Sequence, residues 1–135
     1  MPRLTPVFVT VLALAVLALS VAAAQQTPTR RPVVVNATCP NNANGPLNFT
    51  VNPWLLELNQ DDNVRWNLST NSNKNEIVID AKADSGWPFQ KRQHRGNGKA
   101  DADDMNSNAQ GDYTYTITIY CGNDKVVIDP RVRVQ

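Results

Sequence analysis

The sequence contains few of the residues on which metal sites and nucleophilic enzymes depend. It has one histidine and two cysteines in 135 residues, and its 13 basic residues nearly balance 12 acidic ones. One histidine excludes a metal site built on two imidazoles, and the balanced charge excludes nucleic-acid binding through a general excess of positive charge. No stretch has the apolar spacing of an amphipathic helix. The length indicates one small domain, and 41% hydrophobic residues indicate a packed core.

The one long apolar run lies at the N-terminus. Arg3 precedes it, it ends at Leu19, and small residues follow. This layout predicts a cleaved secretory signal peptide over residues 1–24, a flexible polar lead-in over 25–32 and a folded domain over 33–135. The run is shorter than the roughly 20 residues that span a membrane comfortably. We therefore expect a periplasmic or secreted protein with no stable membrane anchor after cleavage.

Both cysteines, Cys39 and Cys121, lie in the part that would be exported. Because export delivers them to an oxidising compartment where thiols pair, we expect a disulfide between them. The bond would tie the first strand region to the last and stabilise the fold by roughly 3 to 5 kcal/mol in the chain-entropy model. The alternative is that Cys121 is a metal ligand and Cys39 stays unpaired.

Apolar residues alternate with polar ones through most of the remaining chain, which is the pattern of half-buried β-strands. Roughly seven or eight short strands predict an all-β fold, a Greek-key antiparallel β-sandwich. The segments at residues 54–58 and 64–68 flank an acidic turn and predict a hairpin. The polar residues from Gln90 to Gln110 predict a long loop. The expected strands centre on residues 33–35, 47–51, 54–58, 64–68, 77–79, 113–119, 126–128 and 132–134.

Two stretches and the last strand carry a resemblance to a known family. The string VNPWLLELNQDDNVRW, from Val51 to Trp66, combines a proline-led strand, an acidic turn and V-x-W. The string GDYTY, from Gly111 to Tyr115, is similar to a G-x-Y-x-Y strand, and Val132 to Val134 fits a closing strand. Over most of its mature length the chain thus resembles cupredoxin-like domains of the plastocyanin and azurin type. The resemblance implies their β-sandwich scaffold.

The resemblance also implies where copper ligands would lie, and this chain lacks them. Copper sites of this family need two imidazoles and one thiolate. The first imidazole is expected just before Ile77, where Asn75 and Glu76 stand, and no histidine follows Cys121. Cys121 also lies ten residues past Gly111, farther than the family spacing allows. We therefore expect the scaffold without copper, and we expect no other cofactor.

The most distinctive apolar group outside the strands is Trp87-Pro88-Phe89, which a basic stretch containing His94 and Arg95 follows. One interpretation is that the two rings tuck over one end of the sandwich and bury apolar area there. The other is an exposed aromatic patch that binds a protein or glycan partner. Under this second interpretation the candidate binding surface consists of Trp87, Phe89, His94 and Arg95.

Two further patterns are compatible with a ligand or a modification. The acidic run Asp101–Asp104 with Asn106 and Asn108 has the oxygen-rich spacing of a calcium loop, although it lacks the glycine and the distal glutamate of an EF-hand. N-x-S/T sequons are glycosylation acceptors in a eukaryotic secretory pathway. The chain has three of them, at Asn36, Asn48 and Asn67.

No residue constellation supports an enzyme, because no serine stands in a nucleophile motif and the single histidine lies in a charged stretch. We expect a non-catalytic binding or structural protein, a monomer, that acts on an unknown protein or glycan partner. The alternative is a metal-handling or electron-transfer protein with a non-standard copper site around Cys121, His94 and Met105.

Overall fold

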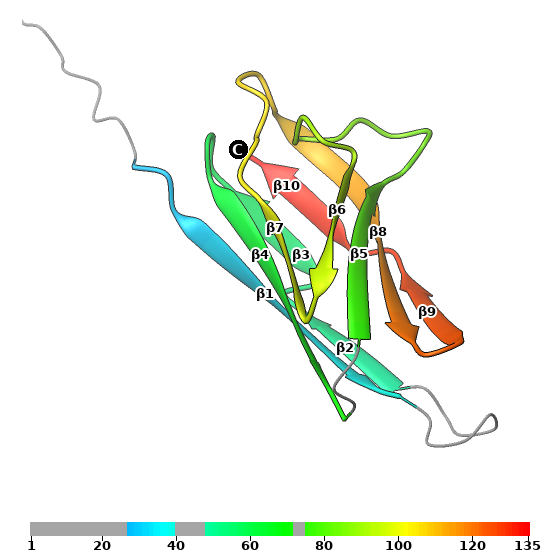
Figure 1. The fold of residues 1–135 in the computed structure, drawn as a ribbon. Helices are drawn as coiled ribbons and strands as arrows, with labels where there is room; N and C mark the ends of the chain where they lie inside the picture. Colours follow the sequence, from blue (N-terminus) through cyan, green and yellow to red (C-terminus); the bar gives the residue numbers. More distant parts are fainter. Residues whose placement is uncertain (1–26, 40–47, 72–74) are drawn as a thin grey trace, which may run out of the picture.

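The computed structural model describes residues 27–39, 48–71 and 75–135, which form two β-sheets packed face to face (Figure 1). The predicted signal peptide and the turn-rich residues 40–47 lie outside the described residues. The described part contains no helix, which confirms the predicted all-β class. Its strands are β1 (Arg30–Thr38), β2 (Asn48–Asn52), β3 (Leu55–Leu58), β4 (Asn63–Thr70), β5 (Asn75–Ala81), β6 (Gln93–Asn97), β7 (Lys99–Ala102), β8 (Gly111–Cys121), β9 (Asp124–Ile128) and β10 (Arg131–Val134).

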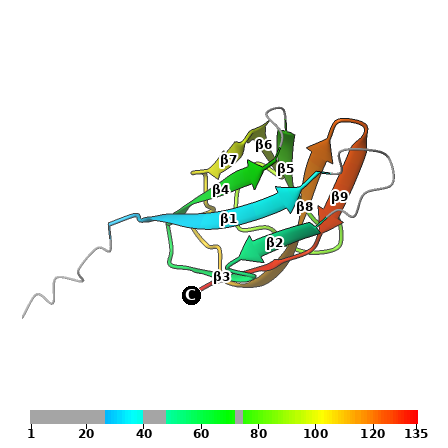
Figure 2. The same ribbon diagram turned by 90° about the horizontal axis from the view of Figure 1, so that it is seen from below.

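The two sheets are mixed rather than purely antiparallel. One sheet has the order β2-β1-β4-β7, and Figure 2 shows these four strands side by side as one layer. The other has the order β3-β10-β8-β5-β6, with β9 paired to β8. Strands β1 and β4 run parallel, as do β3 and β10, and the other pairs are antiparallel. The prediction of an antiparallel sandwich is therefore wrong for these two pairs, in which the strands are far apart in the chain and no hairpin, which would make them antiparallel, joins them.

The predicted hairpin over residues 54–58 and 64–68 is also wrong. Strand β3 pairs with β10 in one sheet, and β4 pairs with β1 and β7 in the other. The acidic turn between them carries the chain from one sheet to the other. Period-two alternation shows that a segment is a half-buried strand, but it does not show which strand lies beside it.

Strands β6 and β7 occupy the middle of the stretch that was expected to be a long loop. Their buried side chains are His94, Ala100 and Ala102, none of which is β-branched, so the alternation is weak in the sequence. Two glycines permit the tight connection between the strands. A Cβ on Gly96 would lie 2.1 Å from the Lys99 carbonyl oxygen, and Gly98 has a φ of +73°.

Strand β1 begins at Arg30, before the expected domain start at Val33. Its start is held by the buried carboxylate of Asp62, which lies in the turn between β3 and β4. Asp62 accepts hydrogen bonds from the backbone N–H groups of Thr29 and Asn59 and from Arg31 Nε, each at 3.0 Å. Burial alone would raise the pKa of Asp62, but these hydrogen bonds outweigh it and hold the pKa below its ordinary value of 3.8.

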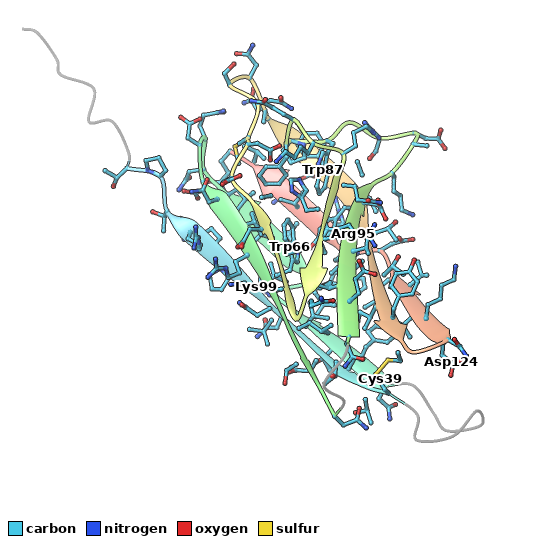
Figure 3. The ribbon with its side chains drawn as sticks, viewed as in Figure 1. Cys39, Trp66, Trp87, Arg95, Lys99 and Asp124 are labelled. Carbon is cyan, nitrogen blue, oxygen red and sulfur yellow. A yellow bond between two sulfur atoms is a disulfide. The ribbon has the colours of Figure 1, made fainter. Side chains whose placement is uncertain are left out.

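The core lies between the inner faces of the sheets, and Trp66 of β4 is at its centre (Figure 3). The Trp66 indole N–H donates to the Tyr115 hydroxyl of β8 at 3.1 Å, and the two ring centroids are 5.9 Å apart. Burial raises the pKa of Tyr115 to about 12, so this hydroxyl stays protonated. The two residues join the sheets through an aromatic contact and a satisfied polar pair.

The predicted disulfide is confirmed: Cys39 and Cys121 are bonded, with Cα atoms 5.5 Å apart. It joins the residue after β1 to the last residue of β8 and so connects the two sheets covalently. Cys39 is buried, and a buried disulfide is typical of proteins that fold in an oxidising compartment. Among the described residues no helix is long and apolar enough to cross a membrane.

Reduction of the disulfide is predicted to lower the free energy of unfolding by about 4 to 5 kcal/mol, because the bond closes a long loop. The two cysteines are 82 residues apart. Urea unfolding with and without a phosphine reductant measures the difference, and a Cys39→Ser/Cys121→Ser double variant is expected to match the reduced protein. An unchanged unfolding midpoint after complete reduction would contradict the prediction.

Asp62→Asn is predicted to lower the free energy of unfolding at neutral pH by about 1 to 3 kcal/mol, the usual cost of losing hydrogen bonds to a charged group. The folded state favours ionised Asp62, so its contribution is complete above the ordinary carboxyl pKa and is lost as pH falls through the lower folded-state pKa. Urea unfolding of both proteins from neutral pH to below pH about 3 tests this. A difference that stayed constant over that range would refute the assignment to the charged form.

Candidate functional site

The four residues predicted to form a binding surface do not share one exposed patch. Trp87, Phe89 and His94 are buried, with 7%, 2% and 6% of their surface exposed. Only Arg95 is exposed, and it is paired with Glu76 on the outer face of the larger sheet. The structure therefore agrees with the first interpretation, in which the rings of Trp87 and Phe89 are buried over one end of the sandwich. They complete the core around Trp66 instead of facing solvent.

Two segments close this end of the sandwich over the rings. The indole N–H of Trp87 donates to the Lys91 carbonyl oxygen at 2.8 Å. Phe89 forms an isolated β-bridge with Met105, and the Gln90 N–H donates to the Asp104 carbonyl oxygen at 2.9 Å. The residues before β6 and the residues after β7 thus hold each other in place. The sequence predicts one long loop here, because the pairing of these two segments has no local signature.

His94 is enclosed by aromatic rings at this end. Its ring centroid lies 6.4 Å from Trp66, 6.4 Å from Trp87 and 5.8 Å from Phe89. Its Nε2 atom lies 3.7 Å from Asp104 Oδ1, too far for a hydrogen bond, and neither atom has a partner among the described residues. One imidazole and one carboxylate are fewer ligands than a structural or catalytic metal site uses.

The residues of the two metal hypotheses are not brought together. The carboxylate of Asp101 accepts two hydrogen bonds from Arg65, which hold its pKa below the ordinary range, whereas Asp104 turns inward to His94. The proposed copper grouping also fails, because Cys121 is in the disulfide at the end opposite Trp87 (Figure 3). Among the described residues no three His, Cys, Asp or Glu side chains are placed to hold a metal ion.

Asn75, one of the two residues that stand where an imidazole was expected, lies beside Cys121. Asn75 pairs in register with Cys121 between β5 and β8. Its Oδ1 atom lies 3.7 Å from the sulfur of Cys39. An amide and a disulfide therefore lie side by side at this end of the sandwich.

The outer face of the four-stranded sheet carries a set of uncharged polar side chains. Asn36 of β1 pairs in register with Thr50 of β2 and with Ser69 of β4, so amide and hydroxyl groups form a row across three strands. Thr38 pairs with Asn48 in the next row. All of these residues are exposed.

A shallow groove of about 420 Å³ lies along this face near the disulfide end. The Asn36 amide donates to the Thr50 hydroxyl at 3.3 Å on its floor. Phe49, 40% exposed, pairs with the buried Ala37, so its ring lies on the opposite face of the sheet. None of the described lining residues is charged. They are Asn36, Ala37, Thr38, Asn48, Phe49, Thr50, Ser69, Thr70 and Asn71.

Charged side chains cover the outer face of the larger sheet instead. Asp112 accepts hydrogen bonds from Arg131 and Arg133, and these partners hold its pKa below the ordinary value. Lys82 pairs with Asp129 at 2.6 Å on the same sheet. The outer face of the smaller sheet also has an ion pair, between Arg65 of β4 and Asp101 of β7, but the groove itself is lined by uncharged side chains.

This face was not among the predicted sites, although the sequence carries a signal for it. The three sequons place an asparagine two residues before a serine or threonine, and two residues is the period of side chains on one face of a strand. Asn36, Asn48 and Asn67 consequently point to the same outer face. The sequence could not show that β1, β2 and β4 are neighbours.

Trp87→Ala is predicted to destabilise the protein by about 3 to 5 kcal/mol, the usual cost of truncating a buried aromatic side chain. Trp54, 49% exposed, provides the matched control, because Trp54→Ala removes the same side chain from a solvent-facing position. Thermal and urea unfolding of both variants measure the effect. Equal small losses in the two variants would show that Trp87 is not part of the core.

Comparison with known proteins leaves the residues themselves as the evidence for function. No family model matches this chain, and no curated protein matches it. The functional conclusion therefore depends on the chemistry of the outer face and the groove.

Proposed function

We propose that this chain is an exported, non-catalytic binding protein built on a cupredoxin-like, Greek-key β-sandwich without copper. Its ligand docks on the outer face of the four-stranded sheet. The observation that carries the proposal is the neutral groove across β1, β2 and β4, in which amide and hydroxyl groups face solvent.

The absence of copper chemistry is supported by the state of Cys121. A type 1 copper site needs a free thiolate, and this sulfur is bonded to Cys39. The neighbouring Asn75 supplies an amide where the resemblance would place an imidazole. For this reason electron transfer through Cys121, His94 and Met105 is not proposed.

A periplasmic or secreted location is supported by two independent features. The first 24 residues have the layout of a signal peptide, and the disulfide lies in the folded part. A periplasmic or secreted protein encounters ligands in the cell envelope or in the extracellular medium.

Binding to the envelope of the producing cells tests the role. The protein, purified from its export compartment and labelled, is added to isolated envelopes, and the bound fraction is measured against concentration. Asn36→Arg places a bulky charge in the groove and is expected to reduce binding at least about tenfold, because an unpaired charge must be desolvated on docking.

Asn97→Arg is the matched control, because Asn97 is exposed at the end of β6 in the other sheet. It is expected to bind like the unaltered protein. Equal loss in both variants, or saturable binding that neither variant changes, would refute the assignment of the binding face. Absence of any saturable binding would refute the binding role itself.

A further inference from the structure

Strand β2 differs from the other edge strands in the described part of the chain because it has no charged residue. Its sequence is NFTVN, and it lies at the margin of the four-stranded layer, paired there with β1 (Figure 2). Charged side chains on an edge strand oppose pairing with another chain. The other edge strands have such charges, at Glu57 in β3, Arg95 in β6, Lys99 and Asp101 in β7, and Asp124 and Lys125 in β9.

The outward side of β2 has backbone groups that another strand could bond. In an antiparallel pair, alternate residues direct their N–H and C=O groups toward the neighbouring strand, and the residues between them direct theirs away. Strand β1 occupies one side of β2, and no backbone hydrogen bond from another described segment reaches β2. The edge therefore presents a template for strand addition.

Two apolar side chains lie on the inner face of this edge. Phe49 pairs in register with the buried Ala37, and Val51 pairs with the buried Val35. Phe49 is nevertheless 40% exposed, and Val51 is only partly buried. Because apolar surface gains free energy when water is excluded from it, an added strand with apolar residues on the same face would stabilise the edge.

The pattern of side chains in β2 is the same in both directions along the strand. Thr50 is at the centre, an apolar residue stands on each side of it, and an asparagine stands at each end. In an antiparallel pair of two copies centred on Thr50, the two threonines face each other. Each Phe49 then faces Val51 of the second copy. Each Asn48 faces Asn52 of the second copy.

This symmetry favours a second copy of the chain over an unrelated strand. Threonine pairs and pairs of an aromatic with a β-branched residue are among the cross-strand contacts that stabilise sheets. A two-fold symmetric interface uses the same surface on both subunits, so the surface has to be complementary to itself. Strand β2 meets this condition, and no like charges are brought together when it pairs with itself.

We propose that two copies of this chain associate through antiparallel pairing of their β2 strands, which joins the four-stranded sheets edge to edge. A dimer replaces the monomer that was expected from the sequence. The outer row of Ser69, Asn36 and Thr50 then continues into Thr50 of the second copy, so the neutral grooves adjoin. The pairing needs no ligand and is independent of the proposed function.

Sedimentation equilibrium of the purified protein, from micromolar to millimolar concentrations, tests the association. A reversible equilibrium between monomer and dimer is expected. Thr50→Lys places two like charges opposite each other on the two-fold axis and is expected to raise the dissociation constant at least about tenfold. Thr50→Glu is expected to do the same. An equal mixture of the two variants is expected to restore the dimer, because opposite charges then face each other.

Asn97→Lys is the matched control, because it adds the same charge at an exposed position on an edge strand of the other sheet. It is expected to dimerise like the unaltered protein, and thermal unfolding checks that all three variants are folded. A single monomeric mass at every concentration would overturn the proposal. A dimer that Asn97→Lys weakens as much as Thr50→Lys does, or a mixture of the two Thr50 variants that stays monomeric, would overturn it as well.

Hydrogen exchange of the β2 amides gives a second, independent measurement on the unaltered protein. The outward-facing amides are expected to exchange more slowly as protein concentration rises, because the dimer protects them. Slow exchange that is independent of concentration would overturn the proposal and assign the edge to another segment of the same chain. Fast exchange at every concentration would also overturn it and would leave the edge for a strand of a different protein.

Discussion

The contact between Trp66 and Tyr115 is the constraint on which the two-sheet arrangement depends. A tryptophan on an inner strand face has to find an acceptor for its N–H, and Trp66 finds it on the opposite sheet. The large ring leaves further surface to be covered at one end, where Phe89 and His94 pack against it and Trp87 packs against Tyr115. Both sheets are thereby held in one relative position, and the alternate residues of β4 must face outward.

The same packing decides which surfaces are free for a ligand. The aromatic cluster closes one end of the sandwich and the disulfide ties the other, so neither end offers the chemistry that the family resemblance would lead one to seek there. The outer faces remain. One is covered by ion pairs, which in water contribute little to stability, and the other has an uncharged polar groove beside the Arg65–Asp101 pair. Function on this scaffold is therefore proposed for a sheet face rather than for loops.

Much of the fold was predictable from residues near each other in the chain. The alternation around Val33, Ile77 and Ile117 identified strands that the structure contains, and export chemistry predicted the disulfide correctly. Strands β6 and β7 were missed because small and polar residues fill their inner positions. The candidate site was predicted at Trp87 and Phe89, but both rings are buried. The sequence could not show this, because the burial of an aromatic ring in a loop depends on whether distant strands leave room for it.

By itself the sequence determined the β class and the absence of a two-histidine metal site, because these follow from local periodicity and from residue counts. It predicted the cysteine pairing from the expected export, and the structure confirmed it. Only the tertiary structure decided which strands are neighbours, since period-two alternation is the same for every half-buried strand. It alone placed β3 and β4 in different sheets and brought Asn36, Thr50 and Ser69 into one row. A binding face assembled from three strands has no local signature, because its members meet only through the pairing of segments distant in the chain.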